Sequence, residues 1–215
     1  MKLYHLTSAQ YAISNIALRR LKVARFGDLN DPFELLAAEQ SDRKFRRGIK
    51  SWKDDYQKSK GLLCFSESWV NPVLWSHYAD KHRGMALGFD VADIHVERVN
   101  YVKDRTQVRF ENDDPEKGLS LSFVEELLRT KYVHWRYEGE WRALVSLNES
   151  TKEDGKYFNY FSERLVLKEV IVGPYCEIPF KHIKKLTEEI DKNIKTMKAK
   201  LGFKRFEVVQ NLKYK

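Results

Sequence analysis

The sequence predicts an α+β fold: a single domain whose mixed, largely antiparallel sheet is flanked by helices. Short apolar runs of strand length recur along the chain and alternate with stretches of helical period. The chain has 215 residues, 42% of them hydrophobic, which is enough for one sizeable core. It contains no internal repeat and no low-complexity linker, so residues 1–215 are expected to form one domain.

The first half of the chain is expected to open with a strand and a capped helix. Residues 2–6 are predicted to be strand, and Thr7 or Ser8 caps a helix that runs to about residue 19 or 20. Asn71-Pro72 is typical of a helix start, because proline suits the first helical position. The other expected elements are an extended stretch at 21–26, a turn at 27–32, a charged helix at 33–56, a strand at 61–66, a short helix at 72–81 and a strand at 84–90.

The second half contains the clearest amphipathic pattern. Its apolar residues recur at helical spacing and predict one helix from 179 or 180 to about 200: Ile183, Leu186, Ile190, Ile194 and Met197. The other expected elements are a strand at 96–103, a polar loop to 118, a helix at 120–128, a strand from 135 through 147, a loop at 148–156, a strand at 165–172 and a terminal strand at 203–209.

Composition limits the class of protein. No apolar run is long enough to span a membrane, and residues 1–5 lack the apolar core of a signal peptide. The two cysteines, Cys64 and Cys176, form no C-x-x-C pair, which favours a reduced, cytoplasmic setting without disulfides. No phosphate-binding loop, dinucleotide fingerprint or zinc-protease motif is present, so no metal site is expected.

The chain carries a formal net charge of +8, and its excess is strongest at the C-terminal end. From Lys181 onward there are eleven lysines or arginines against four acidic residues. This balance suits a polyanionic partner such as RNA or DNA. A lysine-rich solvated helix would give the same composition, and both interpretations stay open.

The stretch 135–142 is the most informative part of the sequence. As a strand with period two, it would place Trp135, Tyr137 and Trp141 on one face. The other face would hold four ionisable residues: Arg136, Glu138, Glu140 and Arg142. Two carboxylates roughly 7 Å apart on a rigid strand suit a cationic transition state. The alternative is a solvated strand face with cross-strand charge pairs.

Three further segments carry polar or aromatic candidates. His5 and Thr7 share a face of the opening strand, and Ser66 and Ser68 end a buried strand. The helix at 72–81 would present three side chains on one face that could stack on a flat ring: Trp75, Tyr78 and His82. The alternatives are a packed histidine, capping serines and helix packing against the sheet.

Several ordered segments together resemble a bacterial family catalogued as domain of unknown function 2971 (DUF2971). They are Tyr4-His5-Leu6-Thr7, Asn30-Asp31-Pro32-Phe33-Glu34, Cys64-Phe65-Ser66, Leu74-Trp75-Ser76-His77-Tyr78-Ala79-Asp80, His82-Arg83-Gly84, Gly88-Phe89-Asp90 and Tyr137-Glu138-Gly139-Glu140-Trp141-Arg142. The resemblance spans residue 4 to about residue 175. Members of this family are often associated with phage defence and abortive infection.

The same order also resembles the three-part signature of ADP-ribosyltransferases, which implies NAD as a substrate. By that likeness His5 would bond the adenosine ribose, and Ser66 and Ser68 would form the Ser-x-Ser element. Tyr78 would stack on nicotinamide. Glu140 would bond the nicotinamide ribose and stabilise the oxocarbenium-like transition state, and Glu138 would orient or deprotonate the acceptor. The resemblance adds the remaining NAD-contacting candidates: Thr7, Trp75 and Arg142.

Three functional hypotheses follow. The first is an NAD-dependent transferase that attaches ADP-ribose to a nucleic acid or protein, as a defence or toxin effector with an antitoxin or regulatory partner. The second is a nucleic-acid-binding or nuclease-like defence protein. The third is a catalytically inactive interaction module, in which Glu138 and Glu140 form ion pairs facing away from any cleft. Under the first, Glu140→Gln is expected to lose activity with little loss of stability.

Overall fold

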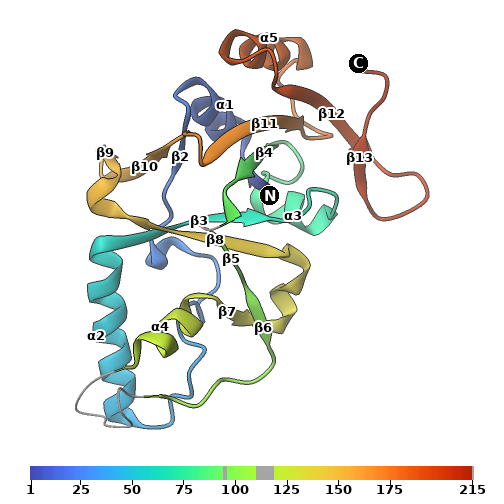
Figure 1. The fold of residues 1–215 in the computed structure, drawn as a ribbon. Helices are drawn as coiled ribbons and strands as arrows, with labels where there is room; N and C mark the ends of the chain where they lie inside the picture. The colour runs from blue at the N-terminus through green and yellow to red at the C-terminus, as the bar shows by residue number, and fades with distance from the viewer. Residues whose placement is uncertain (94–95, 110–118, 215) are drawn as a thin grey trace.

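A computed structural model describes residues 1–93, 96–109 and 119–214. Its centre is an eight-stranded sheet with the order β13-β12-β11-β4-β1-β3-β8-β5 (Figure 1). Neighbouring strands are antiparallel except β11 and β12, which are parallel, so the predicted mixed, largely antiparallel sheet is confirmed. The strands are β1 (Lys2–Thr7), β3 (Lys60–Ser66), β4 (Met85–Val91), β5 (Glu97–Arg98), β8 (Glu140–Ser146), β11 (Leu165–Val172), β12 (Lys195–Leu201) and β13 (Val208–Gln210).

Two smaller sheets and the helices complete the α+β fold. One small sheet joins β2 (Arg20–Lys22), β10 (Lys156–Tyr160) and β9 (Thr151–Glu153), and the other joins β6 (Asn100–Val102) and β7 (Thr130–Tyr132). The helices are α1 (Ala9–Ala17), α2 (Arg43–Ser59), α3 (Pro72–Tyr78), α4 (Leu121–Leu128) and α5 (Phe180–Ile190), with 3-10 turns η1 (Phe26–Asp28), η5 (Val133–Glu138) and η6 (Leu147–Glu149). None of the described helices has the length and apolarity needed to cross a membrane.

The large sheet buries both of its faces, and the two faces carry different helices. Leu3 and Phe89 lie in the core cluster that includes residues of α1 and α5. Leu6 and Ala86 lie three positions from Leu3 and Phe89 on the same strands, and they pack with Trp75 of α3. Because side chains alternate along a strand, neighbouring residues of β1 face opposite sides of the sheet. This alternation decides which predicted site residues can meet.

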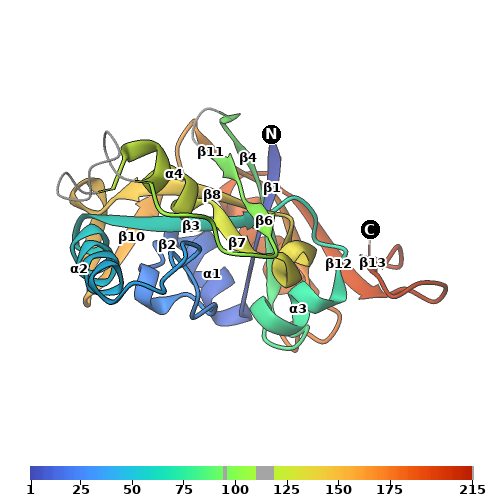
Figure 2. The same cartoon turned by 90° about the horizontal axis from the view of Figure 1, so that it is seen from below.

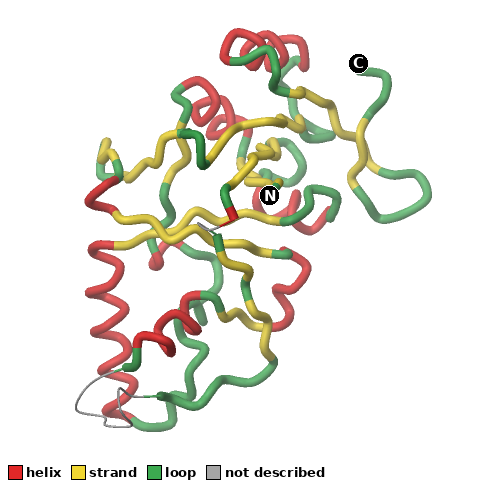
Figure 3. Tube along the Cα trace, in the orientation of Figure 1, coloured by secondary structure: helices red, strands yellow, loops and turns green. Residues whose placement is uncertain are grey.

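Local capping chemistry fixes the helix starts that the sequence predicted. The Ser8 hydroxyl accepts from the Tyr11 N–H, and Asn71 caps α3, whose first residue is Pro72. The charged helix is shorter than expected: α2 begins at Arg43 behind the Asp42 cap, and Figure 3 shows loop between η1 and α2. Part of the predicted polar loop to residue 118 lies outside the described residues.

Two predicted elements are wrong in ways that matter for the site. Residues 133–138 form the 3-10 turn η5 instead of a strand, so the alternation of faces begins only at Glu140. The predicted helix to residue 200 ends at Ile190, because Asp191 accepts the Asn193 N–H and turns the chain into β12. The terminal strand β13 covers only Val208–Gln210, where a strand at 203–209 was predicted. The predicted loop at 148–156 instead contains most of η6, β9 and the start of β10.

Candidate functional site

The strand order brings three sequence-distant segments to one point of the large sheet. Tyr4 of β1 is the register partner of Ser66 on β3, and Ser66 is the register partner of Glu140 on β8. These three residues therefore form a row on one face of the sheet. The Glu67 N–H donates to the Gly139 carbonyl at 3.0 Å, so the Ser-x-Ser and Glu-x-Glu segments lie side by side.

Gly139 shapes the turn between the two glutamates. It has φ +50°, the left-handed conformation that ends η5 and favours glycine. A Cβ at this position would lie 2.7 Å from the Glu67 Cγ. The turn lets both Glu138 and Glu140 reach the ammonium of Lys131 on β7, at 2.5 Å and 3.1 Å.

A buried network of charges surrounds these glutamates. Glu140 accepts two hydrogen bonds from the Arg142 guanidinium, at 2.9 Å from Nε and 3.0 Å from Nη2. Arg142 also forms a two-bond pair with Glu34 and donates to the Leu128 carbonyl at 2.8 Å. All five charged residues are buried: Glu34 is 2% exposed, Glu138 and Arg142 4%, Lys131 5% and Glu140 6%.

The network holds three carboxylates and two cations, which leaves one surplus carboxylate. Burial raises the pKa of Glu138, and this effect outweighs the attraction of the Lys131 ammonium. Burial acts the same way on Glu140, but Arg142 and Lys131 outweigh it and lower the pKa of Glu140 to about 2. Glu138 is therefore the member of the network whose charge is least compensated.

Tyr78 connects Glu138 to the protein surface. Its hydroxyl donates to Glu138 Oε1 and accepts from the exposed Asn30 amide at 2.8 Å. Burial and the Glu138 carboxylate raise the pKa of Tyr78, so it remains a donor. A chain of hydrogen bonds thus runs from Asn30 through Tyr78 and Glu138 to Lys131.

The 3-10 turn η5 lies beside α3 (Figure 2). Four aromatic side chains of these two elements lie together, and we call them the aromatic surface: His77, Tyr78, Trp135 and Tyr137. The His77 ring centroid lies 6.1 Å from Tyr78, 6.2 Å from Trp135 and 5.8 Å from Tyr137. His77 is exposed and the other three are half-buried. The Lys131 ammonium lies 4.8 Å from the Trp135 ring, so the aromatic surface adjoins the charge network.

His5 and Thr7 do not belong to this site, which corrects the sequence prediction. They alternate with Tyr4 and therefore face the opposite side of the sheet. The His5 Nδ1 donates to the Cys64 carbonyl at 3.0 Å, and its ring meets Phe65 edge-on at 6.2 Å. Burial lowers the pKa of His5. Tyr4 occupies the place in the row that the sequence analysis gave to His5.

The structure also shows where the other predicted site residues lie, namely Trp75, the two serines and His82. Trp75 has no exposed surface and donates to the Trp69 carbonyl at 2.5 Å, so the prediction that it stacks on a ligand is wrong. Ser66 is 7% exposed and lies across from Glu140. Ser68 accepts the Val70 N–H at 3.3 Å, a local turn bond. His82 lies beyond the end of α3, and its ring stacks on the buried Trp75 at a centroid distance of 6.4 Å.

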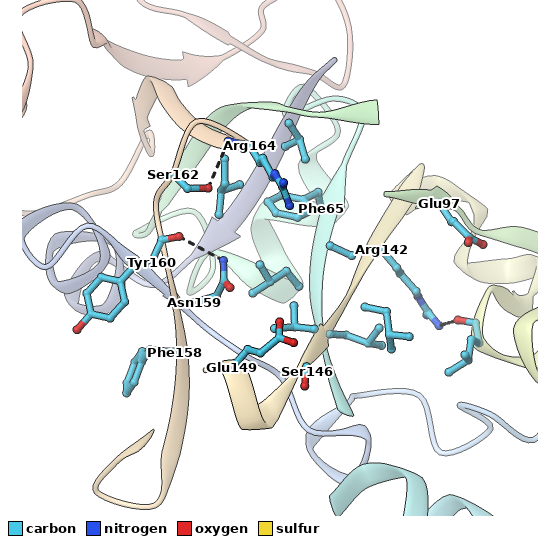
Figure 4. A pocket seen from close by; sticks show the side chains of 18 of the residues that line it. Phe65, Glu97, Arg142, Ser146, Glu149, Phe158, Asn159, Tyr160, Ser162 and Arg164 are labelled. Atoms are coloured by element: carbon cyan, nitrogen blue, oxygen red, sulfur yellow. Dashed lines mark hydrogen bonds between the residues drawn. The ribbon is translucent and has the colours of Figure 1, made fainter. Parts of the chain in front are cut away.

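A groove of about 690 Å³ lies between β3 and β8 on one side and the β10–β11 segment on the other (Figure 4). Arg164 and Glu149 stand at opposite ends of the groove, with Asn159 between them. Of the predicted site residues, Arg142 lines it, and its guanidinium there is bonded to the Leu128 carbonyl. Tyr78, Glu138 and Glu140 do not line the groove, so it is separate from the aromatic surface.

Sequence reasoning missed several members of the network. Lys131 is an isolated lysine with no local motif, and Tyr101 accepts the Glu140 N–H at 2.8 Å from a separate small sheet. Asn30 and Glu34 lie in the Asn-Asp-Pro-Phe-Glu segment that the family resemblance included. That segment was therefore the available sequence signal for Asn30 and Glu34, and no such signal existed for Lys131 and Tyr101.

A protein-family model described as a protein of unknown function (DUF2971) matches residues 74–143. The resemblance to DUF2971 is confirmed. The matched segment contains α3 from Leu74 onward, Lys131 and β8 as far as Ala143, and therefore Tyr78, Glu138, Glu140 and Arg142. Searches of curated proteins and of solved structures found no match to this chain. The matched segment thus contains the aromatic surface and four of the five charged residues of the network, while Glu34 lies outside it.

Proposed function

We propose that this protein is an NAD-dependent, ADP-ribosyltransferase-like enzyme of the cytoplasm that modifies a nucleic acid or a protein. The observation that carries the proposal is a surplus buried carboxylate, Glu138, bonded to Tyr78 of the aromatic surface. The nicotinamide group of NAD is a flat, cationic ring. Aromatic faces and a nearby fixed negative charge both favour such a ring.

The chemistry assigns a different role to each part of the site. The bond between the ribose carbon and the nicotinamide nitrogen breaks, and its electron pair leaves with nicotinamide. The acceptor forms the new bond to the ribose carbon and loses a proton. Glu138 is suited to accept that proton, because burial raises its pKa toward the working range of a general base. Glu140, fixed by Arg142 and Lys131, positions Glu138 through the shared Lys131.

The DUF2971 resemblance adds the biological setting of the proposal. Members of that family are associated with phage defence, so we place the enzyme among defence or toxin effectors. An antitoxin or regulatory partner would restrain such an effector. A second candidate, an inactive interaction module, is favoured by the burial of Glu138 and Glu140 in ion pairs. In that case the network only stabilises the fold.

Nicotinamide release tests the proposal. Wild-type protein is incubated with NAD and a mixture of RNA, DNA and cell extract. Glu138→Gln keeps the side-chain shape and is expected to lower release at least 100-fold while the circular dichroism spectrum stays native. Tyr78→Phe keeps the ring but loses the hydroxyl bond, and a partial loss is expected. The matched control is Glu153→Gln, which removes a carboxylate paired with buried Arg20 in the small sheet.

The outcomes separate the two candidates. Release by wild type and Glu153→Gln, but not by folded Glu138→Gln, supports the enzyme. Absence of release from wild type in every mixture contradicts it and favours the interaction module.

A further inference from the structure

The C-terminal hairpin presents its tip away from the body of the molecule (Figure 1). β12 and β13 pair antiparallel up to Leu201 and Val208, and the Gly202 N–H donates to the Glu207 carbonyl at 2.8 Å to close the loop. The base is firmly held: Val208 is fully buried, and its N–H donates to the Val70 carbonyl at 2.8 Å. The structure therefore displays residues 203–206 on a rigid support.

The tip carries two phenylalanines that make almost no contact with the protein. Phe203 is 92% exposed and Phe206 is 99% exposed. Lys204 and Arg205 lie between them and are also exposed. The Lys200 ammonium lies 4.8 Å from the Phe203 ring centroid. Large apolar side chains gathered at one exposed point indicate a surface that meets a partner.

We propose that this tip is a docking site for single-stranded nucleic acid. Aromatic rings stack on bases regardless of their identity, and lysine and arginine contact the phosphates between them. The sequence Phe-Lys-Arg-Phe supplies both kinds of contact, with two cations between the two rings. Charge is complementary over a wider region, because eleven cations against four carboxylates follow from Lys181 onward in a chain of net charge +8.

The positions of the two cations favour nucleic acid over a lipid surface. In a loop that inserts into a membrane, the deepest residues are apolar and the cations stay at the headgroup level. Here Lys204 and Arg205 occupy the apex between the two rings. Inserting both rings would carry two charges toward the hydrocarbon, which is costly. A nucleic acid strand instead presents phosphates that can contact both cations while its bases stack on the rings.

The test is fluorescence anisotropy with labelled oligothymidylate and oligouridylate. We expect Phe203→Ala with Phe206→Ala to weaken binding about 100-fold, since each lost stacking contact corresponds to about tenfold in Kd. Lys204→Gln with Arg205→Gln should reduce the slope of log affinity against log salt by about 1.4. The matched control is Tyr11→Ala on α1, which removes another exposed aromatic ring (54% exposed) and should leave Kd unchanged.

Two results would overturn the proposal. One is an unchanged oligonucleotide Kd in the double phenylalanine variant, whose native fold is checked by circular dichroism. The other is sedimentation of wild type with phosphatidylserine vesicles together with no oligonucleotide binding, which would assign the tip to a lipid surface. Neither readout involves NAD, so failure here and failure of nicotinamide release are distinguishable.

Discussion

Replacing Glu140 with glutamine should destabilise the protein far more than the same change at Glu138. Glu140 loses its charge toward Arg142, which it meets at 2.9 and 3.0 Å, and toward Lys131 at 3.1 Å. The amide group of glutamine would also turn N–H donors toward these cations. The structure thus revises the expectation that Glu140→Gln costs little stability.

The magnitude follows from which partners remain. Removing one member of a buried ion pair costs about 3–5 kcal/mol. The lower end applies at Glu140, because Arg142 keeps Glu34 and Lys131 keeps Glu138. At Glu138 the change removes the surplus charge, and its cost should be about 1 kcal/mol, a single hydrogen-bond contribution.

Urea unfolding followed by the fluorescence of the five tryptophans measures both variants. With a slope of about 2.5 kcal/mol per M, the midpoint should fall by about 1 M for Glu140→Gln and by less than about 0.5 M for Glu138→Gln. Equal midpoints for the two variants, or a larger loss at Glu138, would refute the account of the network.

Three further predictions follow. The pKa of Glu140 in the folded protein, about 2, lies below its ordinary value of 4.5, so the stability that its charge contributes is present above pH 4.5 and is lost as the pH falls toward 2. In urea titrations, the difference in free energy of unfolding between wild type and Glu140→Gln should therefore narrow over that pH range. Burial lowers the pKa of His5 below 6.5, so acidification below about pH 6.5 should lower the unfolding temperature of wild type more than that of His5→Gln. Equal drops in unfolding temperature would show that protonation of His5 does not destabilise the fold. Gly139→Ala should cost more than about 1 kcal/mol, because alanine is strained at φ +50° and its Cβ meets Glu67; an unchanged urea midpoint would contradict this.

The sequence predicted those parts of the fold that local chemistry decides. Ser8 and Asn71 cap helices through bonds to residues two or three positions along the chain, so the pattern contains the whole interaction. The strands at 61–66, 84–90 and 165–172 are apolar runs buried in the large sheet. Their existence needed no tertiary information, whereas their order in the sheet did.

The errors arise where distant contacts outweigh local preference. Residues 135–138 are rich in aromatic side chains, which favour strands, but Glu138 bonds Tyr78 and Lys131, and the chain winds into a 3-10 turn. Ile194 and Met197 match a helical period, yet the turn at Asp191 carries them to β12.

The sequence singled out the two glutamates of the candidate site, but it did not predict all of the charged partners that surround them. The Glu-x-Glu segment pointed to Glu138 and Glu140, and both lie in one network. Lys131 pairs with both glutamates from β7, and nothing in its own neighbourhood marks it as a partner. Glu34 pairs with Arg142, and its only signal in the sequence was the segment that the family resemblance included. His5 was misplaced because a one-residue difference along β1 exchanges the faces of the sheet.

Amide hydrogen exchange with and without NAD tests the central claim most directly, because it locates the site as well as detecting binding. The account predicts that NAD slows exchange in α3 (Pro72–Tyr78) and across η5 and the start of β8, the elements of the aromatic surface and of Glu138. Protection confined to the groove around residues 158–165, or no protection anywhere, would contradict it.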